Sequence, residues 1–362
     1  MTRDELFSIK ADVPSREIYE KSVSRWDSIA KPIDGLGRFE KTVSSMAAAT
    51  GKVCPDISKK ALIIMCADNG IFEEGISQTD QAVTESVAAL MGAEKSSVGI
   101  MAGTYPVDFL VYDVGINSDT TPEGVIAAKV RRGSRNFLKE PAMTGDECLQ
   151  AIEAGISAVK RCAESGAGLI ATGEMGIGNT TTSTALMCAV KGLDPKKYTG
   201  RGAGLSDEGL ERKMRVIEEG LRIYRKDDRY RGITDKAEAF DALCCLGGLD
   251  IAGLVGVFIG GALCHIPVVI DGLISASAAL LAGILVPPSR YYMIASHLGR
   301  EKGMEIILDE LGLEAVIDAD LALGEGTGAL LLFPMLDMVM SLYRSGTAFA
   351  DTGIGQYERF DV

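Results

Sequence analysis

A carboxylate between two glycines is the residue of this sequence best suited to acid–base chemistry. Glu325 stands in the segment Leu323–Ala329, LGEGTGA, directly before a long apolar stretch. Flanking glycines let a side chain enter a crevice, where a carboxylate can act as a general base. The same pattern also describes an ordinary acid at a helix start, stabilised by the helix dipole. The residues alone leave both interpretations open.

Glycines and hydroxyls gather in the segment Gly173–Thr182, GEMGIGNTTT. Glycines let backbone N–H groups approach a ligand, and hydroxyls leading into a helix suit a phosphate held at the helix N-terminus. The segment has neither the Gly-Lys-Ser/Thr of a Walker A loop nor the G-x-G-x-x-G dinucleotide pattern. The alternative is an ordinary strand-to-helix turn capped by Thr180, and both interpretations stay open.

The segment Gly200–Lys213, GRGAGLSDEGLERK, offers a cation near a helix start. Ser206 or Asp207 is suited to cap this helix, and Lys213 falls in its second turn. Lys213 is a candidate counter-charge for a phosphate. A solvated lysine on a surface helix is the interpretation that this segment alone favours.

The elements that position these residues alternate along the chain. The strand candidates are Ala61–Ala67, Val107–Asp113, Gly168–Thr172, Pro267–Ile270, Tyr292–Ser296 and Ala315–Ile317. The helix candidates between and after them include Gln81–Glu94, Asp146–Glu164, Thr180–Lys191, Asp207–Arg225, Asp235–Cys245, Ile274–Ala282, Arg300–Leu311 and Leu330–Tyr343. This alternation predicts an α/β fold, a mostly parallel sheet with helices on both faces in a Rossmann-like three-layer arrangement. Ligands of such sheets bind at the carboxyl ends of the strands, so the polar clusters there are expected to converge on one crevice.

Two units are expected. Residues 1–50 have a helical pattern without a strand, and with residues 345–362 they are expected to form a small helical lobe. Residues 51–344 are then the large α/β catalytic domain.

One apolar stretch tests this interpretation. Residues 251–270, IAGLVGVFIGGALCHIPVVI, contain no Asp, Glu, Lys or Arg and are long enough for a membrane span. Pro267 interrupts the stretch, and Asp250 and Asp271 flank it where basic or aromatic anchors are usual. A buried helix followed by a buried strand is therefore the prediction.

Composition narrows the function classes. The 37 Lys and Arg against 50 Asp and Glu give a net charge of −13, which argues against non-specific nucleic-acid binding but allows a local anion pocket. Eight cysteines without a C-x-x-C pair indicate buried reduced thiols and a cytoplasmic location. The N-terminus does not resemble a secretory signal. The two histidines, His265 and His297, exclude a His-rich metal site and receive no role.

An ordered set of segments resembles the nicotinate-nucleotide–dimethylbenzimidazole phosphoribosyltransferase family of cobalamin biosynthesis. Besides the three segments above, the likeness covers KPIDGLGRFE (31–40), ADNGIFEEGIS (67–77), GGLDIAGLVG (247–256), IPVVIDGLISASAAL (266–280) and ASHLGREKG (295–303). Each segment alone is weak evidence, whereas the ordered set is specific and extends over most of the chain.

The resemblance implies an activity and a site. The family moves the phosphoribosyl group of nicotinate mononucleotide to a benzimidazole nitrogen, releasing nicotinate, and its members are homodimers. It implies Glu325 as the general base and Glu174 as a second active-site acid. The substrate-binding residues expected from it are Gly176, Gly178, Asn179, Thr180, Thr181, Lys213, Gly202, Asp271, Ser77, Glu85 and Asp68. No cofactor, metal, nucleic acid or membrane span is expected.

The chemistry agrees with this set. The pyridinium leaves as a neutral ring and needs no acid, whereas the acceptor loses a proton as it attacks, so one carboxylate suffices. A second carboxylate such as Glu174 is suited to stabilise charge at C1′. The phosphate is a handle that does not react.

Three departures from the family pattern leave the acceptor open. The chain has KPIDGLG where relatives usually read Lys-Pro-Pro-Gly-Ser-Leu-Gly, Asn69 where they carry His, and Glu85 where many carry Gln. These segments lie near the family's acceptor pocket. Some relatives, paired as two unlike subunits, activate phenol and p-cresol, so a phenolic acceptor in a heterodimer is the second hypothesis. A catalytically silent partner subunit is the third, and retention of both Glu174 and Glu325 argues against it.

Overall fold

A six-stranded parallel sheet forms the centre of the molecule. The computed structural model describes residues 1–225 and 231–360. The strand order is β3-β2-β1-β4-β5-β6, and every neighbouring pair is parallel. The strands are β1 (Lys60–Ala67), β2 (Asp108–Gly115), β3 (Ile126–Ala127), β4 (Leu169–Met175), β5 (Val268–Ile270) and β6 (Met293–Ala295). The predicted α/β class is confirmed.

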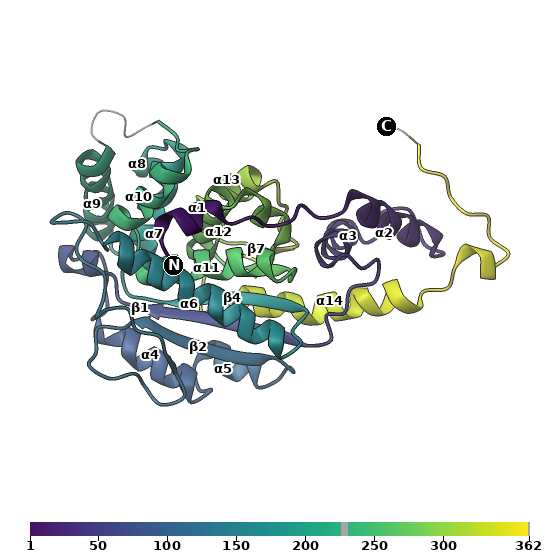
Figure 1. Cartoon of the computed structure of the whole chain (residues 1–362), viewed down its shortest axis with the longest axis horizontal. Helices are drawn as coiled ribbons and strands as arrows, with labels where there is room; N and C mark the ends of the chain where they lie inside the picture. Colours follow the sequence, from purple (N-terminus) through teal and green to yellow (C-terminus); the bar gives the residue numbers. More distant parts are fainter. Residues whose placement is uncertain (226–230, 361–362) are drawn as a thin grey trace.

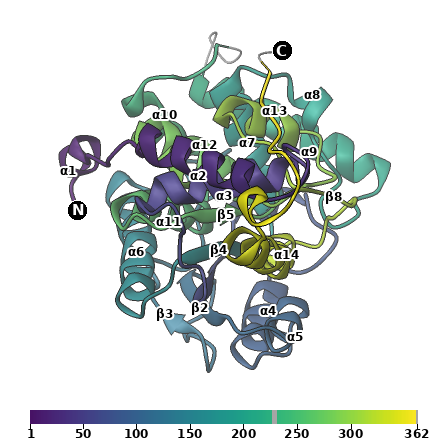
Figure 2. The same ribbon diagram turned by 90° about the vertical axis from the view of Figure 1, so that its right-hand side faces the viewer.

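Both faces of the sheet are covered by helices because β1 is apolar on both sides. Ala61, Ile63 and Met65 belong to one core cluster, and Leu62 and Ile64 belong to the other, as the two-residue period of a strand requires. The first cluster includes α6 (Gly145–Glu164), α7 (Asn179–Lys191), α10 (Lys236–Leu246), α11 (Leu249–Leu263) and α12 (Leu273–Leu285). The second includes α4 (Ala82–Gly92), α5 (Ser97–Ala102) and α14 (Thr327–Ser345). In Figure 1 α6 is drawn across the sheet, and the turned view of Figure 2 shows the strands between α6 and the pair α4 and α5.

Two strand predictions need correction. The strand expected to end at Thr172 continues to Met175, because Gly173–Met175 pairs with Ile64–Cys66 of β1. Glu174 is thus a strand residue rather than a loop residue. The strand expected at Ala315–Ile317 lies outside the main sheet, where β8 (Ile317–Asp318) pairs with β7 (His297–Leu298).

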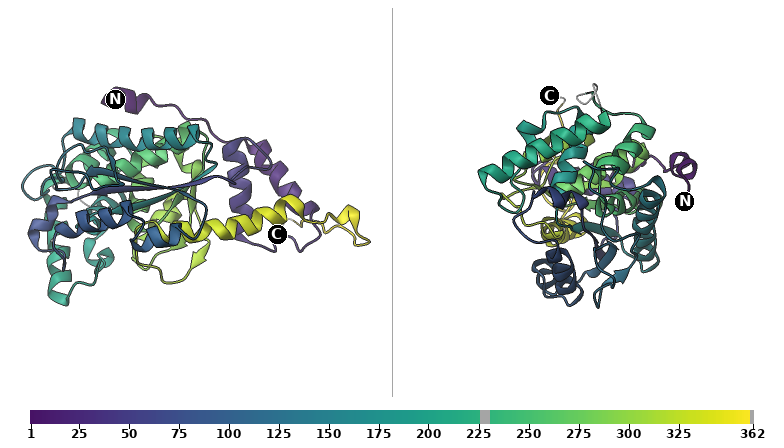
Figure 3. Two further views of the ribbon diagram at one scale, coloured as in Figure 1. Left: turned by 90° about the horizontal axis from the view of Figure 1, so that it is seen from below. Right: turned by 90° about the vertical axis from the view of Figure 1, so that its left-hand side faces the viewer.

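The chain outside the sheet packs in two places. Helix α1 (Arg3–Ser8) contacts the main body, since the N-terminal amine lies 3.0 Å from Glu153 of α6. Helices α2 (Arg16–Ser28) and α3 (Arg38–Thr50) pack against the end of α14, where the Trp26 and Tyr343 rings are 4.6 Å apart. Figures 2 and 3 show this α2–α3 lobe at the end of α14. The other helices are α8 (Pro195–Tyr198), α9 (Asp207–Arg225), α13 (Met304–Leu311) and several 3₁₀ turns. The division at residue 50 stays a prediction.

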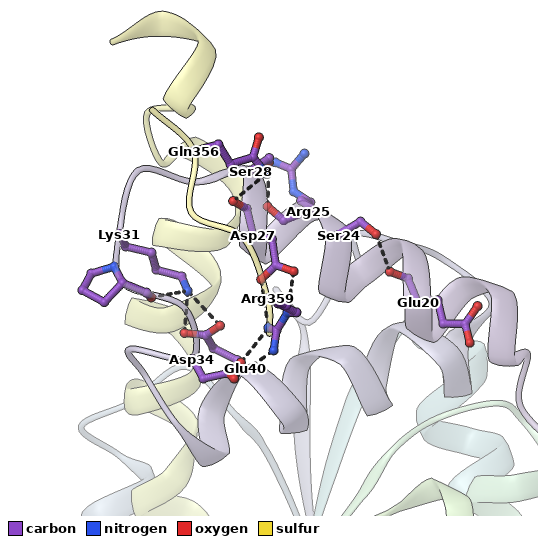
Figure 4. Close-up of polar contacts among 11 residues, drawn as sticks. Glu20, Ser24, Arg25, Asp27, Ser28, Lys31, Asp34, Glu40, Gln356 and Arg359 are labelled. Carbon is purple, nitrogen blue, oxygen red and sulfur yellow. Dashed lines mark hydrogen bonds and ion pairs between the residues drawn. The ribbon is translucent and has the colours of Figure 1, made fainter. Parts of the chain in front are cut away.

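The C-terminal tail is tied to the α2–α3 lobe by ion pairs. The guanidinium of Arg359 lies 2.7 Å from the carboxylates of both Asp27 and Asp34 (Figure 4). Asp34 is part of the KPIDGLG segment and has a positive φ of 53°. In the same segment Lys31 lies 2.7 Å from the buried carboxylate of Glu40.

The apolar stretch at 251–270 consists of the buried helix α11 followed by β5, as predicted. Within the described chain, no helix combines the length and the apolar character that a membrane crossing requires. Glycines let α11 approach α6 closely. A Cβ on Gly256 would lie 1.9 Å from the carbonyl oxygen of Ile152, and one on Gly155 would lie 2.0 Å from that of Gly253.

Gly256→Ala is expected to lower the free energy of unfolding by about 1–3 kcal/mol or more, because the added methyl group forces α6 and α11 apart. Urea denaturation measures this loss. Gly145→Ala is the matched control, since a Cβ at this first residue of α6 meets only the Phe240 ring at 3.7 Å. Equal stabilities of the two variants would contradict the assigned helix contact.

Candidate active site

The turn that carries Glu325 is pressed against the carboxyl-end half of β4. A Cβ on Gly173 would lie 2.7 Å from the carbonyl oxygen of Glu325, so only glycine allows this approach. On the other side of the turn, a Cβ on Gly324 would lie 3.1 Å from Oε1 of Glu174. The two acids predicted for catalysis are therefore neighbours, and both lie close to the turn of residues 176–178 that joins β4 to α7.

Asp271 holds this turn in place. Its two carboxylate oxygens accept hydrogen bonds from the backbone N–H groups of Gly326 at 3.1 Å and Ala329 at 2.9 Å. Glu325 itself has a φ of +60°, and its Oε2 accepts a hydrogen bond from the N–H of Val98 at 3.1 Å. Asp271 thus lies at the predicted site, where it positions Glu325 from the end of β5.

A buried group of acids and amides surrounds Glu174. The Nδ2 of Asn179 donates to Glu174 and also lies 3.1 Å from Oδ2 of Asp250, the second residue of α11. The Nδ2 of Asn69 lies 3.5 Å from the same oxygen, and Thr182 donates to the Asn69 oxygen. Asn69 is therefore part of the scaffold of this group.

Burial decides the protonation of these acids. It raises the pKa of Glu174 to about 8, and the charge of Asp250 adds to the effect. Burial likewise raises the pKa of Asp250 to about 6, and it raises that of Asp271. The ligand-free site therefore holds a proton on Glu174 near neutral pH, although several carboxylates meet there.

The segment 173–182 leads from β4 through a short turn at residues 176–178 into α7 as predicted, but the cap of this helix differs. Gly178, with a φ of +97°, is the N-cap, because Thr180 lies inside the helix. The interpretation of Thr180 as the cap is wrong. A Cβ on Gly176 would lie 2.7 Å from Oδ2 of Asp250, so this glycine allows the loop to pass the acid group. The hydroxyl of Thr181 is buried and has no hydrogen-bond partner in residues 1–225 and 231–360.

Lys213 is buried beside this loop, so its interpretation as a solvated surface lysine is wrong. Its side chain is 1% exposed, and its Nζ donates to Oγ1 of Thr180 at 2.8 Å. Gly202 covers the pair, since a Cβ there would lie 2.9 Å from Oγ1 of Thr180. Burial lowers the pKa of Lys213 to about 8, against the charge of Glu301. The predicted residues Thr180, Lys213 and Gly202 are thus brought together.

A groove of about 700 Å³ opens beside the Gly200–Gly204 loop, a volume in the range of small-molecule sites. Three of its side chains are cations, Arg201, Arg300 and Lys302, so the groove is locally basic in an acidic protein. Its Glu301 also lines a narrower hollow with Glu174 and Asp271. The sequence reasoning did not single out these four side chains.

The remaining predicted residues, Asp68, Glu85 and Ser77, make hydrogen bonds to other partners. The Oδ2 of Asp68 accepts from the N–H of Asn117 at 2.7 Å, and burial raises the pKa of this acid to about 6. Glu85 accepts from the Ser118 hydroxyl at 2.6 Å. Ser77 contacts Thr79, while its neighbour Gln78 donates to the carbonyl of Gly204 and so links this loop to the groove.

Comparison with known proteins shows the family of this chain. The model of a family described as phosphoribosyltransferase matches residues 11–354. The chain is similar to the nicotinate-nucleotide–dimethylbenzimidazole phosphoribosyltransferases of Acetivibrio thermocellus (41% identity, 94% of this chain and 96% of that protein) and Clostridium acetobutylicum (39%, 94% and 95%). The crystal structure of CobT from Thermus thermophilus has a TM-score of 0.86 at 33% identity, covering 94% of this chain and all of that one.

Glu174→Gln is expected to flatten the pH dependence of stability. The folded chain keeps the Glu174 proton up to a pKa of about 8, whereas an unfolded glutamic acid loses it near 4.5. The folded state binds more protons between these values, so stability falls as the pH rises through this window. Glutamine does not ionise and keeps an oxygen for Asn179. Urea denaturation at about pH 6 and about pH 8.5 should show a clear loss for the wild type and little for the variant.

Glu147→Gln is the control for this experiment. Although burial opposes it, hydrogen bonding to Arg135 lowers the pKa of Glu147 to about 2. Glu147 is therefore ionised in the folded and the unfolded state throughout this pH window. The free energy of unfolding of Glu147→Gln should differ from that of the wild type by the same amount at both pH values. Parallel curves for the wild type and Glu174→Gln would contradict the protonated state of Glu174.

Proposed function

This chain belongs to the phosphoribosyltransferase family, and we propose that it transfers the phosphoribosyl group of nicotinate mononucleotide to 5,6-dimethylbenzimidazole. The products are α-ribazole phosphate and nicotinate, an activity of cobalamin biosynthesis. The observation that carries the proposal is the position of Glu325 against β4, beside Glu174 and the glycine-rich loop. The names of relatives about 40% identical support the substrates.

The donor is placed by its charges. Its phosphate fits beside the start of α7, where Lys213 and Thr180 meet and helix N–H groups favour an anion. The basic side chains of the neighbouring groove support the same end of the donor. This arrangement brings the anomeric carbon toward Glu174 and Glu325.

Two carboxylates then have different tasks. The pyridinium ring of the donor is cationic, so its arrival lowers the pKa of Glu174 again, and the ionised Glu174 stabilises the oxocarbenium-like transition state. The benzimidazole nitrogen attacks C1′, and nicotinate leaves as a neutral ring with its bonding electrons. As the unprotonated nitrogen forms its bond to C1′, Glu325 takes the proton from the other ring nitrogen, so that the ribosylated benzimidazole is released as a neutral ring. The half-buried carboxylate of Glu325 accepts one hydrogen bond from the described part of the chain, that from Val98, and so stays accessible to an acceptor.

A phenolic acceptor is the second candidate. The observation that favours it is Glu85, which lies with Asp68 in the region that the resemblance places near the acceptor. Glu325 does not distinguish the two acceptors, because a phenol also needs a base. The silent-subunit alternative has less support, since both acids are present and adjacent.

We further propose that the chain works as a dimer, which we take to be a homodimer with the benzimidazole acceptor. The α14 stripe, defined as Leu331, Met335, Met338 and Leu342, exposes one apolar face of this helix, and Met338 is 68% exposed. The KPIDGLG segment also supports a second copy. The segment belongs to the α2–α3 lobe, which lies at the C-terminal end of α14 (Figure 3), whereas Glu325 precedes the N-terminal end of this helix. The segment of a second copy is therefore better placed to approach the acceptor at Glu325 than the segment of the same chain.

The cytoplasm is the location that we propose. All eight cysteines are free, and several, such as Cys66 and Cys188, lie in the core. Structural thiols of this kind are typical of a reducing compartment.

The wild-type chain is expected to release nicotinate from nicotinate mononucleotide when dimethylbenzimidazole is present, and Glu325→Gln should slow this turnover by about 10²–10⁴-fold, the usual contribution of a positioned base. Glutamine keeps the oxygen that accepts from Val98, so the fold and the affinity for the donor should remain. Chromatographic measurement of nicotinate and of the ribosylated product tests both statements, with p-cresol as the second acceptor.

Glu123→Gln, a change of the same type at an exposed position, is the matched control and should retain full turnover. Near-wild-type turnover of Glu325→Gln would remove Glu325 as the base. Product formation with p-cresol and none with dimethylbenzimidazole would replace the proposed acceptor. If nicotinate is released neither with dimethylbenzimidazole nor with p-cresol, the silent-subunit hypothesis would be favoured.

Met338→Lys is expected to shift the chain from dimer to monomer, because it places a charge in the centre of the α14 stripe, where the proposed contact buries it. Light scattering coupled to size-exclusion chromatography measures the mass. Val13→Lys changes an equally exposed apolar residue between α1 and α2 and should leave the dimer intact. A dimeric Met338→Lys variant would exclude this face as the contact.

A further inference from the structure

The imidazole of His297 is a buried group that the proposed mechanism leaves without a task. His297 is the first residue of β7, and it is 4% exposed. Its ring lies against the first turn of α14, where a Cβ on Gly328 would lie 2.2 Å from the ring atoms Cε1 and Nδ1. Gly328 therefore fixes the ring beside the turn that carries Glu325.

The hydrogen bonds of Ser296 assign the ring proton. The Oγ of Ser296 lies 2.6 Å from the carbonyl oxygen of Ile270, which only accepts, so the hydroxyl hydrogen is used there. Nδ1 of His297 lies 2.9 Å from the same Oγ and must donate to it. A neutral imidazole held in this way presents the lone pair of Nε2. This Nε2 has no hydrogen-bond partner within the part of the chain that the structure describes.

The ring lines the narrow hollow introduced above, together with Glu174, Asp271 and Glu301. Nε2 of His297 and the carboxylate of Glu301 accept hydrogen bonds, so the ligand that complements this hollow carries O–H or N–H donors. The hollow shares Glu301 and Ala322 with the basic groove. The hollow has a volume of about 30 Å³, room for a single hydroxyl group, so a ligand with its anionic end in the groove reaches it with one donor group.

We propose that Nε2 of His297 accepts a hydrogen bond from a ribose hydroxyl of the phosphoribosyl donor, an inference that rests on the proposed function. The donor runs from phosphate through the ribose diol to the anomeric carbon, and the site runs in the same order from the groove through the hollow to Glu174. Hydrogen bonds to the hydroxyl next to a reacting anomeric carbon strengthen as charge develops there. The contact thus makes His297 a substrate-binding residue that selects ribosyl over deoxyribosyl donors.

The test measures the Kd of nicotinate mononucleotide and of its 2′-deoxy and 3′-deoxy analogues by titration calorimetry, without acceptor. For the wild type, removal of the hydroxyl that His297 binds should weaken binding by about 5- to 150-fold, the range for one unsatisfied buried partner. His297→Asn retains a donor for Ser296 but has no acceptor at the Nε2 position, so its penalty for this analogue should vanish. His297→Gln places an amide at the Nε2 position and should retain part of the penalty. Thermal unfolding compares the folded state of the three proteins.

The outcomes separate this inference from the proposed function. Equal penalties in the wild type and His297→Asn, or a uniform weakening of all three donors by both variants, would show a structural role and overturn the inference alone. The expected binding pattern without turnover would overturn the proposed reaction alone. No binding of any donor by the wild type would overturn both.

Discussion

The approach of the α14 turn to β4 is the contact on which the site depends. At Gly173 the two backbones are so close that no side chain fits between them. This contact places Glu325 next to Glu174, although the two residues are far apart in sequence. Asp271 completes the arrangement from β5, because its carboxylate is used by two N–H groups of the same turn. The positions of Glu174 and Glu325 are therefore set by backbone packing and hydrogen bonds at the carboxyl ends of β4 and β5.

Acidic and basic side chains occupy two adjoining regions at the carboxyl ends of the strands. Glu174, Asp250 and Asp271 are buried together, and burial opposes their ionisation. The neighbouring groove instead contains Arg201, Arg300 and Lys302. A molecule with a cationic ring and an anionic phosphate is complementary to this division. The acid group is costly in the ligand-free protein, as is usual where a site is arranged for a charged transition state.

Many of the residues at the carboxyl ends of the strands can be predicted from the sequence pattern. Apolar runs ending in acids or glycines predicted the strands, and the parallel fold predicted that Asp68, Glu174 and Asp271 share an edge. These predictions depend on local periodicity, which the sequence contains. The extension of β4 through Gly173–Met175 was missed because it depends on pairing with β1. Strands of two residues, such as β7, carry no periodic signal at all.

Other parts of the site depend on tertiary contacts. Lys213 has the sequence pattern of a surface lysine, and its burial follows from the glycine loop folded over it. Asp250 stands as a single acid beside an apolar run, and only the packing of α11 brings it to Asn179. Gly178 replaces Thr180 as the cap because its φ is positive, a property that spacing does not reveal. The family resemblance supplied the roles that these patterns lacked.

Helix α14 also connects the reaction centre to the far lobe. It begins beside Glu325 and ends where Tyr343 meets Trp26, and its 19 residues span roughly 28 Å at 1.5 Å per residue. Because α14 is held at both ends, a change in packing around Trp26 would be passed along the helix to the turn that carries Glu325, without any change near the substrate. Evolutionary tuning of the rate is thus open to mutations in the lobe, remote from every reacting atom.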